Sequence, residues 1–411
     1  MRNIAIIGGG PAGCTAGTIL AKAGHRVAIF TGTTRPPLIV GESLLPAVIP
    51  MLRRLGVEES IRDFSVFKPG ATICLGNHED LDFAFGLARS RCNYAYNVPR
   101  DLFDQCLTDS ARAAGAVIIP SKAQPELTND PKHPVVLSAD TLAAVRHVFD
   151  GDVDLIIDAS GRTRLLPHLL ELPSAEGRRK DLALFSHREG VHLLSPGNIH
   201  VDRYTRGWGW RIPLPGRVSV GIVVDPKHLA ALGDSREDQY EAFLATEPEL
   251  KHAVQDSKRV SPVMSYTNYQ WKSKQLYGPG WALAGDSAGF IDPVFSTGLF
   301  LAMRSAENLA DAVVEGTDSA MARYASGHWK ELEAWQSIIN TWYDGRLFTL
   351  FRLGQRHRTN LFGKIINPHI TKHVTRIFTG EIRSGSYSHK LLNLMTNRAV
   401  DMTSSAALAI R

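Results

Sequence analysis

The stretch that decides how this chain folds is its beginning, which reads Ile4-Ala5-Ile6-Ile7-Gly8-Gly9-Gly10-Pro11-Ala12-Gly13. Four apolar residues without a charge predict a buried parallel strand. Gly8, Gly10 and Gly13 then follow with the spacing G-x-G-x-x-G, and we expect an alanine-rich helix from there to about Gly24. In such a unit the glycines permit a tight turn, backbone contact with a pyrophosphate, and close packing of helix on strand. The sequence therefore predicts a dinucleotide-binding unit, with the phosphates at the helix N-terminus.

The second strand of this unit, residues 25–30, lacks its usual acidic end. An Asp or Glu at that position normally binds the adenosine ribose. Here the strand ends in Phe30-Thr31-Gly32, without a carboxylate. We expect the ribose to be held more weakly or by other groups, and the dinucleotide to bind loosely.

The composition is that of a soluble globular protein of 411 residues, long enough for two or three domains. Its four cysteines form no C-x-x-C pair, which predicts neither a zinc site nor a disulfide framework and fits a reducing compartment. The histidines show no metal-ligand spacing, so we assign no metal. The apolar N-terminus carries the glycine motif rather than a cleavage site, and no run reaches transmembrane length. We expect a cytoplasmic protein without membrane contact.

The net charge of +5 is concentrated at the C-terminal end. Residues 346–411 hold 11 Lys and Arg against 2 Asp and Glu. Such a tail is suited to an acidic partner, but a solvated helical surface is the simpler interpretation and the one we favour. No recognised nucleic-acid-binding module surrounds the charge, so we expect no nucleic acid partner.

Strands of one parallel sheet recur along the chain. We expect them at the start, at 116–119, at 153–157 before Asp158-Ala159-Ser160-Gly161, and at 281–284 before Gly285-Asp286. A helix is expected over 46–55, with Ser43 as its cap. The strands imply a dinucleotide-binding domain in three pieces, residues 1–70, 95–180 and 275–318.

The gaps between these pieces hold a second kind of structure. Alternating apolar residues predict a hairpin over 71–75 and 81–85, joined by the polar turn 76–80, and further strands over 195–225. We assign 71–94 and 181–274 to a sheet-rich substrate domain. Residues 120–134 are interpreted as a polar excursion, a long helix is expected to end near Glu315, and 319–411 is predicted to be a helical C-terminal region. The fold class is therefore α/β.

Together, the glycine loop, Asp158-Ala159-Ser160-Gly161 and Gly285-Asp286 resemble the FAD-dependent aromatic monooxygenases. The resemblance spans residues 1 to about 315 and implies that FAD is the dinucleotide. It implies that Asp286 binds the ribityl or phosphate region and that Arg100, before the third helix, contacts FAD. The residues we expect to bind the cofactor are Gly8, Gly10, Pro11, Ala12, Gly13, Glu42, Ser43, Arg100, Asp158, Gly161, Gly285, Asp286 and Pro293.

Three further stretches are similar to flavin-dependent halogenases of the phenol or pyrrole type. Residues 208–213, Trp-Gly-Trp-Arg-Ile-Pro, match the W-x-W-x-I-P signature. Residues 290–298, Phe-Ile-Asp-Pro-Val-Phe-Ser-Thr-Gly, resemble the segment that holds halide beside the flavin, and Lys68 resembles the catalytic lysine. The resemblance implies a catalytic set of Lys68, Trp208, Trp210, Ile212 and Pro213, with chloride or bromide at Thr297 and Gly298.

In that family, reduced flavin and oxygen give a hydroperoxide at the flavin C4a carbon, and a halide attacks it to yield hypohalous acid. Backbone N–H groups at the start of a helix suit a halide, so we expect Thr297 and Gly298 to supply them. The alternative is that residues 296–298 only cap that helix. Lys68 would receive the hypohalous acid, by hydrogen bond or as a haloamine. The alternative is an ordinary surface lysine.

Trp208 and Trp210 alternate on a strand and so share a face, where they line the passage between flavin and substrate or only belong to the core. Glu42 and Asp292 are possible supporting acids, although acids in loops are usually solvated or capping. Loose FAD binding implies that a separate flavin reductase supplies FADH2. The substrate is a free aromatic compound, one bound to an acidic carrier protein, or a residue of a partner protein.

Two other functions stay open. One is an aromatic hydroxylase on the same scaffold that inserts oxygen without needing Lys68 or halide; some relatives with halogenase-like sequences modify a tryptophan of a partner protein. The other is a non-catalytic flavin-binding protein, suggested by the missing acid after Phe30 and disfavoured by Lys68 and the tryptophan signature.

Overall fold

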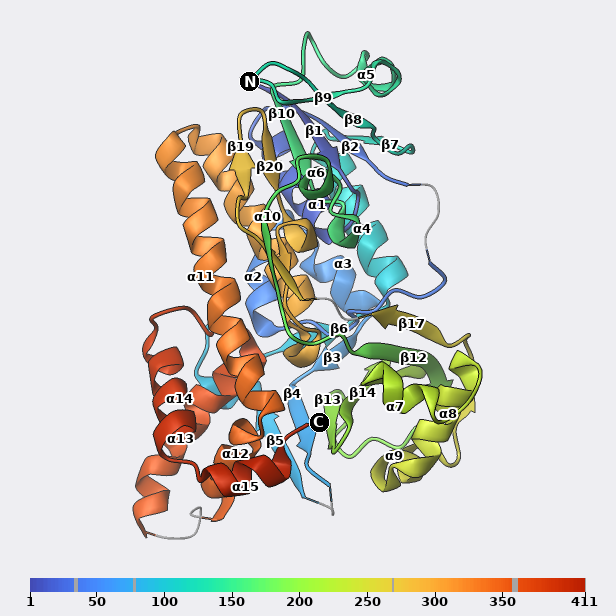
Figure 1. Cartoon of the computed structure of the whole chain (residues 1–411), viewed down its shortest axis with the longest axis vertical. Coiled ribbons are helices and arrows are strands. Elements are labelled where there is room, and N and C mark those ends of the chain that lie inside the picture. The colour runs from blue at the N-terminus through green and yellow to red at the C-terminus, as the bar shows by residue number, and fades with distance from the viewer. Residues whose placement is uncertain (33–35, 77–78, 268–269, 357–360, 411) are drawn as a thin grey trace.

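Figure 1 shows the computed structural model of the chain, which describes residues 1–32, 36–76, 79–267, 270–356 and 361–410. Two large sheets lie one below the other in this view, and the C-terminal helices run along one side of both. The arrangement confirms the α/β class. The boundaries we assigned to domains stay a prediction.

The first sheet has six strands and is mostly parallel. Its order is β19 (Tyr277–Gly278), β20 (Trp281–Leu283), β10 (Leu155–Asp158), β1 (Asn3–Ile7), β2 (Arg26–Phe30) and β7 (Val117–Ile119). Only β19 is antiparallel to its neighbour. Every residue of β1 is buried, as its apolar run predicts. The strands expected at 116–119, 153–157 and 281–284 are confirmed within two residues.

Helices pack on this sheet and on one another beside it. They are α1 (Pro11–Lys22), α2 (Ile49–Leu55), α3 (Glu58–Asp63), α4 (Arg100–Ala113), α5 (Ala139–Val145), α6 (Leu165–Leu169), α10 (Thr297–Glu315) and α11 (Asp318–Tyr343). After β20 the chain continues into α10, which packs against α1. Helix α11 in turn packs on α10. The predicted end of the long helix at Glu315 is confirmed.

The second sheet has eight strands. Its order is β16 (Lys258–Arg259), β12 (Leu182–Glu189), β15 (Arg217–Val224), β14 (Gly207–Leu214), β13 (Ile199–Tyr204), β4 (Gly70–Cys74) and β5 (Asp80–Ala84), with β17 (Met264–Thr267) also on β12. The predicted hairpin is confirmed, because β4 and β5 pair antiparallel. Asn77 and His78 of its expected turn lie outside the described residues.

Alternation along the strands gives this sheet two different faces. Leu184, Val220 and Ile222 pack on one face against Tyr240 and Phe243 of the helical layer. That layer consists of α7 (Pro226–Ala230), α8 (Arg236–Thr246) and α9 (Pro248–Val254). The opposite face carries Ala183, Trp208 and Trp210 and is turned toward the first sheet.

Smaller elements join the sheets. They are β11 (Ser174–Glu176) with β18 (Trp271–Ser273) and β21 (Gly289–Phe290), β3 (Val66–Lys68) with β6 (Ala95–Asn97), and β8 (Pro125–Leu127) with β9 (Val135–Leu137). The polar excursion predicted over 120–134 is therefore wrong in part. Residues 125–127 form β8 because β9 supplies a pairing partner that the local sequence does not reveal.

The C-terminal region is helical, as predicted. After α11 come α12 (Arg346–Arg356), α13 (Leu361–Thr379), α14 (Tyr387–Arg398) and α15 (Met402–Leu408). Several of its cations pair within the chain: Arg346 with Asp344 at 2.7 Å and Arg352 with Glu79 at 2.7 Å. Figure 1 shows the C-terminus beside β13, where Arg203 Nε donates to the Leu408 carbonyl at 3.0 Å. Within the described ranges, no helix is long and apolar enough to span a membrane.

Candidate functional site

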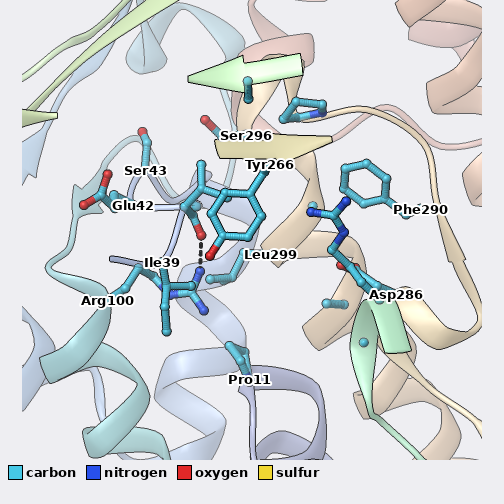
Figure 2. A pocket seen from close by; sticks show the side chains of 18 of the residues that line it. Pro11, Ile39, Glu42, Ser43, Arg100, Tyr266, Asp286, Phe290, Ser296 and Leu299 are labelled. Atoms are coloured by element: carbon cyan, nitrogen blue, oxygen red, sulfur yellow. Dashed lines mark hydrogen bonds between the residues drawn. The ribbon is translucent and has the colours of Figure 1, made fainter. Parts of the chain in front are cut away.

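A cavity of about 410 Å³ lies where the two sheets face each other. Its wall begins at the glycine loop and ends at the start of α10. In Figure 2, Pro11 marks the glycine-loop side, Ile39, Glu42 and Ser43 one flank, and Asp286 with Phe290 the other. The cavity therefore joins most of the sequence-predicted site residues.

The glycine loop has a shape that side chains would destroy. A Cβ atom on Gly13 would lie 1.9 Å from the Gly8 carbonyl oxygen, and one on Gly8, whose φ is +112°, would lie 2.3 Å from the Ala159 oxygen. A Cβ atom on Gly10 would meet nothing within 4 Å, because Gly10 faces the cavity. Helix α1 starts here with no side-chain cap, which leaves its first N–H groups for an anion. The loop fits a dinucleotide pyrophosphate.

Three predicted cofactor residues, Gly13, Asp158 and Gly285, lie behind this wall rather than in it. The Asp158 carboxylate accepts hydrogen bonds from the backbone N–H groups of Ser160 at 2.8 Å and Leu166 at 2.7 Å. Burial raises the pKa of Asp158 despite these donors. Asp158 thus fixes the loop that presents Gly161 to the cavity. Gly285, with φ +67°, permits close approach to Ala12, since a Cβ atom there would lie 2.8 Å from the Ala12 Cβ atom.

Asp286 lies in the cavity wall itself. Burial raises the pKa of its carboxyl to about 6, while Arg162 and Arg100 act in the opposite direction. Its backbone carbonyl is fixed by Trp271, whose indole N–H donates to it at 2.8 Å. The backbone of Asp286 is therefore fixed in the cavity wall, and its contact with the ribityl or phosphate part of FAD stays a prediction.

Arg100 connects helix α4 to the segment 38–45, which crosses one flank of the cavity. Its guanidinium donates to the Val40 carbonyl, shown by the dashed line in Figure 2, and pairs with Asp104 at 3.1 Å. Tyr266 donates to the Leu38 carbonyl of the same segment at 3.2 Å. Arg100 and Tyr266 both line the cavity. The expected contact of Arg100 with FAD is therefore within reach.

Glu42 and Ser43 have partners that the sequence does not reveal. Arg217 Nε donates to His187 Nδ1 at 3.0 Å, so the other ring nitrogen, Nε2, donates to Glu42 Oε1 at 2.7 Å. In Figure 2 the Glu42 carboxylate points away from Tyr266. The predicted role of Ser43 as a helix cap is wrong, because its hydroxyl donates to Asn97 Oδ1 at 2.8 Å instead. The helix that begins at Pro46 has no side-chain cap.

Trp208 and Trp210 share one face of β14, as predicted, and both line the cavity. Their ring centroids are 5.9 Å apart. Gly221 lies opposite Trp210 on β15, and a Cβ atom on Gly221 would lie 2.1 Å from the indole ring. This glycine therefore lets the indole lie flat on the sheet. Ile212 also lines the cavity, whereas Pro213 is buried and is not part of its wall.

The segment before α10 forms the far end of the cavity. Pro293, Phe295, Ser296 and Gly298 line it. Phe295 and Ser296 both adopt left-handed backbone conformations, with φ of +64° and +59°, which non-glycine residues seldom do. Ser296 makes no side-chain capping bond, and Thr297 turns its hydroxyl to the Asp292 carbonyl at 3.2 Å. The N-terminus of α10 is thus without a side-chain cap.

Lys68 is buried, which excludes the interpretation of an ordinary surface lysine. Only 1% of its surface is exposed. The amine donates to the Leu44 carbonyl at 2.8 Å and lies 5.3 Å from the centroid of the Phe85 ring. Burial lowers its pKa to about 7. Lys68 is not part of the cavity wall. Its hydrogen-bond partner Leu44 directly follows Ser43, and Ser43 is part of the wall.

Sequence reasoning missed several residues of this site. Tyr266 belongs to no motif, and Ile39 and Val40 carry no chemical group that would attract notice. Phe295 and Ser296 stand inside a quoted stretch, but their backbone strain has no sequence signal. Tyr343, which accepts a hydrogen bond from Trp208 at 3.0 Å, lies in the region 319–411, for which the sequence predicted only helical structure.

Comparison with known proteins extends over nearly the whole chain. A family model described as tryptophan halogenase matches residues 84–351, and one described as FAD binding domain matches residues 1–141. The 1H-pyrrole-2-carbonyl-[peptidyl-carrier protein] chlorinase of Pseudomonas fluorescens is 27% identical over 395 residues, covering 87% of each chain.

Two solved structures share the fold. CmlS, a flavin-dependent halogenase, is 27% identical with a TM-score of 0.72, and the match covers 98% of this chain and 72% of CmlS. The flavin-dependent brominase Bmp2 is 21% identical with a TM-score of 0.79, and the match covers 97% of this chain and 98% of Bmp2. The likeness thus includes both sheets and the C-terminal helices.

Proposed function

Because the chain belongs to the tryptophan halogenase family of flavin-dependent enzymes, we propose that it uses FADH2 to halogenate an electron-rich aromatic compound. Family membership confirms the expected fold, the halogenase resemblance and FAD as the cofactor. The proposal adds that halide is oxidised to hypohalous acid and that Lys68 delivers it to a phenol or pyrrole. The observation that carries it is the single cavity joining the glycine loop to Trp208, Trp210 and the start of α10.

Bound FAD in its reduced form, with oxygen, supplies the oxidising power that converts a halide to hypohalous acid. The chain's own part is to hold the cofactor and exclude water. The N-terminus of α1 and Gly10 fit its pyrophosphate, and Arg100 and Asp286 are placed for further contacts. We assign Glu42 and Ser43 to the flank that covers the cofactor.

The halide site we propose is the N-terminus of α10. The backbone N–H groups of Thr297 and Gly298 lie at the positive end of a 19-residue helix, and no side chain caps this end. Gly298 lines the cavity, and because glycine has no side chain, an anion can approach its backbone N–H group. The left-handed turn at Phe295 and Ser296 sets the position of these groups.

Lys68 is the group we propose for delivery. With a pKa of about 7, a large share of its amine is neutral near neutral pH. A neutral amine that donates one N–H to Leu44 keeps a second N–H and a lone pair. It can hydrogen-bond the hypohalous acid, or its lone pair can take the halogen as the oxygen–halogen bond breaks, while the released hydroxide takes one amine proton and leaves as water. The aromatic carbon then takes the halogen, and the ring proton restores the amine.

Trp208 and Trp210 form the apolar wall between the FAD side and the delivery side. Their indole N–H groups are engaged by Tyr343 and Ser219, and both residues line the cavity. We propose that Ile212 extends this wall. Pro213 is the last residue of the W-x-W-x-I-P signature and does not line the cavity. We propose that it only shapes the backbone of β14.

Two partners belong to the proposal. A separate flavin reductase would supply FADH2, since no carboxylate follows Phe30 to hold the adenosine ribose. A carrier protein would present the aromatic group, by analogy with the pyrrole-carbonyl chlorinase among the relatives. A free phenol or pyrrole, or a residue of a partner protein, are the other substrates that the test must include.

The experiment supplies the protein with FAD, a flavin reductase, NADH, oxygen and bromide, together with phenols, pyrroles and a pyrrole-loaded carrier protein. Product masses are measured with and without bromide. A bromine isotope pair supports the proposal. Addition of one oxygen, independent of halide, would instead establish the aromatic hydroxylase. Flavin oxidation without any product from all substrate classes would contradict both.

A further inference from the structure

Tyr343, at the end of α11, brings the C-terminal region into contact with the cavity wall. The indole Nε1 of Trp208 donates to the Tyr343 hydroxyl at 3.0 Å. The same hydroxyl donates to Asp292, with its oxygen 3.0 Å from Oδ2 and 3.3 Å from Oδ1. An indole N–H only donates and a carboxylate only accepts, so the direction of both bonds is fixed. One phenol thus joins Trp208 to Asp292.

Asp292 in turn holds the turn that ends the cavity. Its Oδ1 accepts the backbone N–H of Val294 at 3.0 Å, and its backbone carbonyl accepts the Thr297 hydroxyl at 3.2 Å. These two bonds lie on either side of Phe295 and Ser296, the residues with left-handed backbone. A strained turn persists only where its surroundings hold it in place. Asp292 therefore helps to hold the cavity-lining turn in its strained form.

Tyr343 is itself firmly held. The Arg179 guanidinium stacks on its ring, 3.8 Å from the centroid, and is bound to Asp181 by bonds of 2.7 and 2.9 Å. The Tyr343 carbonyl accepts the backbone N–H of Ile410 at 2.8 Å. Burial keeps the phenol protonated by raising its pKa far above the ordinary value, so it remains a donor to Asp292. The stacked Arg179 and the backbone bond to Ile410 therefore help to fix the Tyr343 ring, in addition to the bonds of its hydroxyl.

We propose that Tyr343 is a positioning residue of the halogenation site, which sets Trp208 and, through Asp292, the Phe295–Ser296 turn in one fixed relation. This inference rests on the proposed function, because it assigns the turn to the halide and Trp208 to the wall. Without the hydroxyl, the indole N–H and the carboxylate both lose a buried partner. Trp208 then moves more freely, and the N–H groups at Thr297 and Gly298 hold halide less well.

Tyr324 offers a matched control on the same helix. It is also buried, and its hydroxyl donates to the Leu283 carbonyl of β20 rather than to any cavity residue. Tyr343→Phe and Tyr324→Phe therefore remove the same atom from two buried tyrosines of α11. A purely structural role predicts similar consequences for both variants.

The test uses the full chain labelled with 5-fluorotryptophan, with the Trp208 resonance identified by its absence in Trp208→Phe. We expect the fluorine resonance of Trp208 to shift or broaden in Tyr343→Phe and to stay unchanged in Tyr324→Phe. This readout needs no turnover. An unchanged Trp208 resonance in a folded Tyr343→Phe variant would overturn the inference.

Turnover with bromide supplies the second readout. For Tyr343→Phe we expect the bromide KM to rise by roughly tenfold, the effect of one lost buried hydrogen bond, and less product per FADH2 oxidised. Tyr324→Phe should match the wild type in both. Equal values for the two variants would contradict the inference. If the wild type itself makes no brominated product, the proposed function fails, while the resonance of Trp208 still decides the positioning role.

Discussion

The glycine loop at one end of the cavity is formed by the backbone of one short segment, whereas the side chains that we place behind the cavity wall come from distant segments. Gly8, Gly10 and Gly13 lie within six residues and need only their own strand and helix to take shape. Lys68 and Tyr343, by contrast, come from β3 and α11, about two thirds of the chain apart. The cofactor loop therefore depends on local backbone geometry, while the proposed delivery and positioning groups depend on how distant parts of the chain pack.

The largest effect is expected at the backbone end, from Gly13→Ala. Its Cβ atom would lie 1.9 Å from the Gly8 oxygen, so helix and strand must separate. We expect the free energy of unfolding to fall by about 1–3 kcal/mol and FAD binding to be lost. Denaturant unfolding and flavin titration measure the two quantities.

Gly10→Ala is the matched control, because nothing lies within 4 Å of its Cβ position. It should unfold like the wild type and still bind FAD less tightly, since the methyl group enters the space for the pyrophosphate. If Gly13→Ala and Gly10→Ala had equal stability and equal FAD affinity, the backbone shape of the glycine loop would not be what stabilises the fold and binds FAD.

Among the side chains behind the cavity wall, the burial of Lys68 predicts a pH-dependent stability. Its pKa is about 7 in the folded chain and about 10.4 in the unfolded chain. Between these pH values Lys68 is protonated in the unfolded chain and neutral in the folded chain. Stability therefore rises with pH, because the unfolded chain loses its extra proton as pH increases. Relative to Lys68→Met, the wild type should gain about 1.4 kcal/mol per pH unit from pH 7 toward 10.

Urea unfolding of both proteins at several pH values measures this slope, and below pH 7 the difference between them should become constant. Curves that stay parallel from neutral to alkaline pH would show that Lys68 keeps its ordinary pKa. Lys68 would then lack a neutral amine at neutral pH, and the delivery step would need another group.

The smallest effect concerns the surface rather than the cavity. If an acidic carrier protein docks on the basic C-terminal region, turnover with a carrier-bound pyrrole should fall several-fold from low to high salt. Turnover with the free pyrrole should change little. Equal salt dependence for the two substrates would remove the support for a carrier that docks by charge.

Much of the fold could be predicted from the sequence, because local patterns decide it. The run Ile4–Ile7, the glycine spacing and the hairpin of β4 and β5 need no distant partner to be recognised. The strand β8 was not predicted, because it forms only by pairing with β9, which begins eight residues after β8 ends. The Ser43 hydroxyl escaped for the same reason, since its partner Asn97 lies on β6.

The candidate site was predictable where a motif marks it. Trp208, Trp210 and the residues before α10 were found through short signatures, and the structure places them around one cavity. No signature marks Tyr343 or Tyr266, whose roles come only from the packing of α11 and β17 against the wall. The burial of Lys68 likewise depends on Leu44 and Phe85, which its own neighbours in the sequence do not announce.

The central claim is that the hypohalous acid formed in the cavity is delivered to the aromatic substrate by Lys68. The most direct test is the mass of the product from one equivalent of FADH2 with bromide, for wild type and Lys68→Met side by side. The account predicts a bromine isotope pair from the wild type and a loss of roughly 10²-fold or more in the variant, with FAD binding intact. Equal bromination by both proteins, or a product that gains only oxygen, would contradict it.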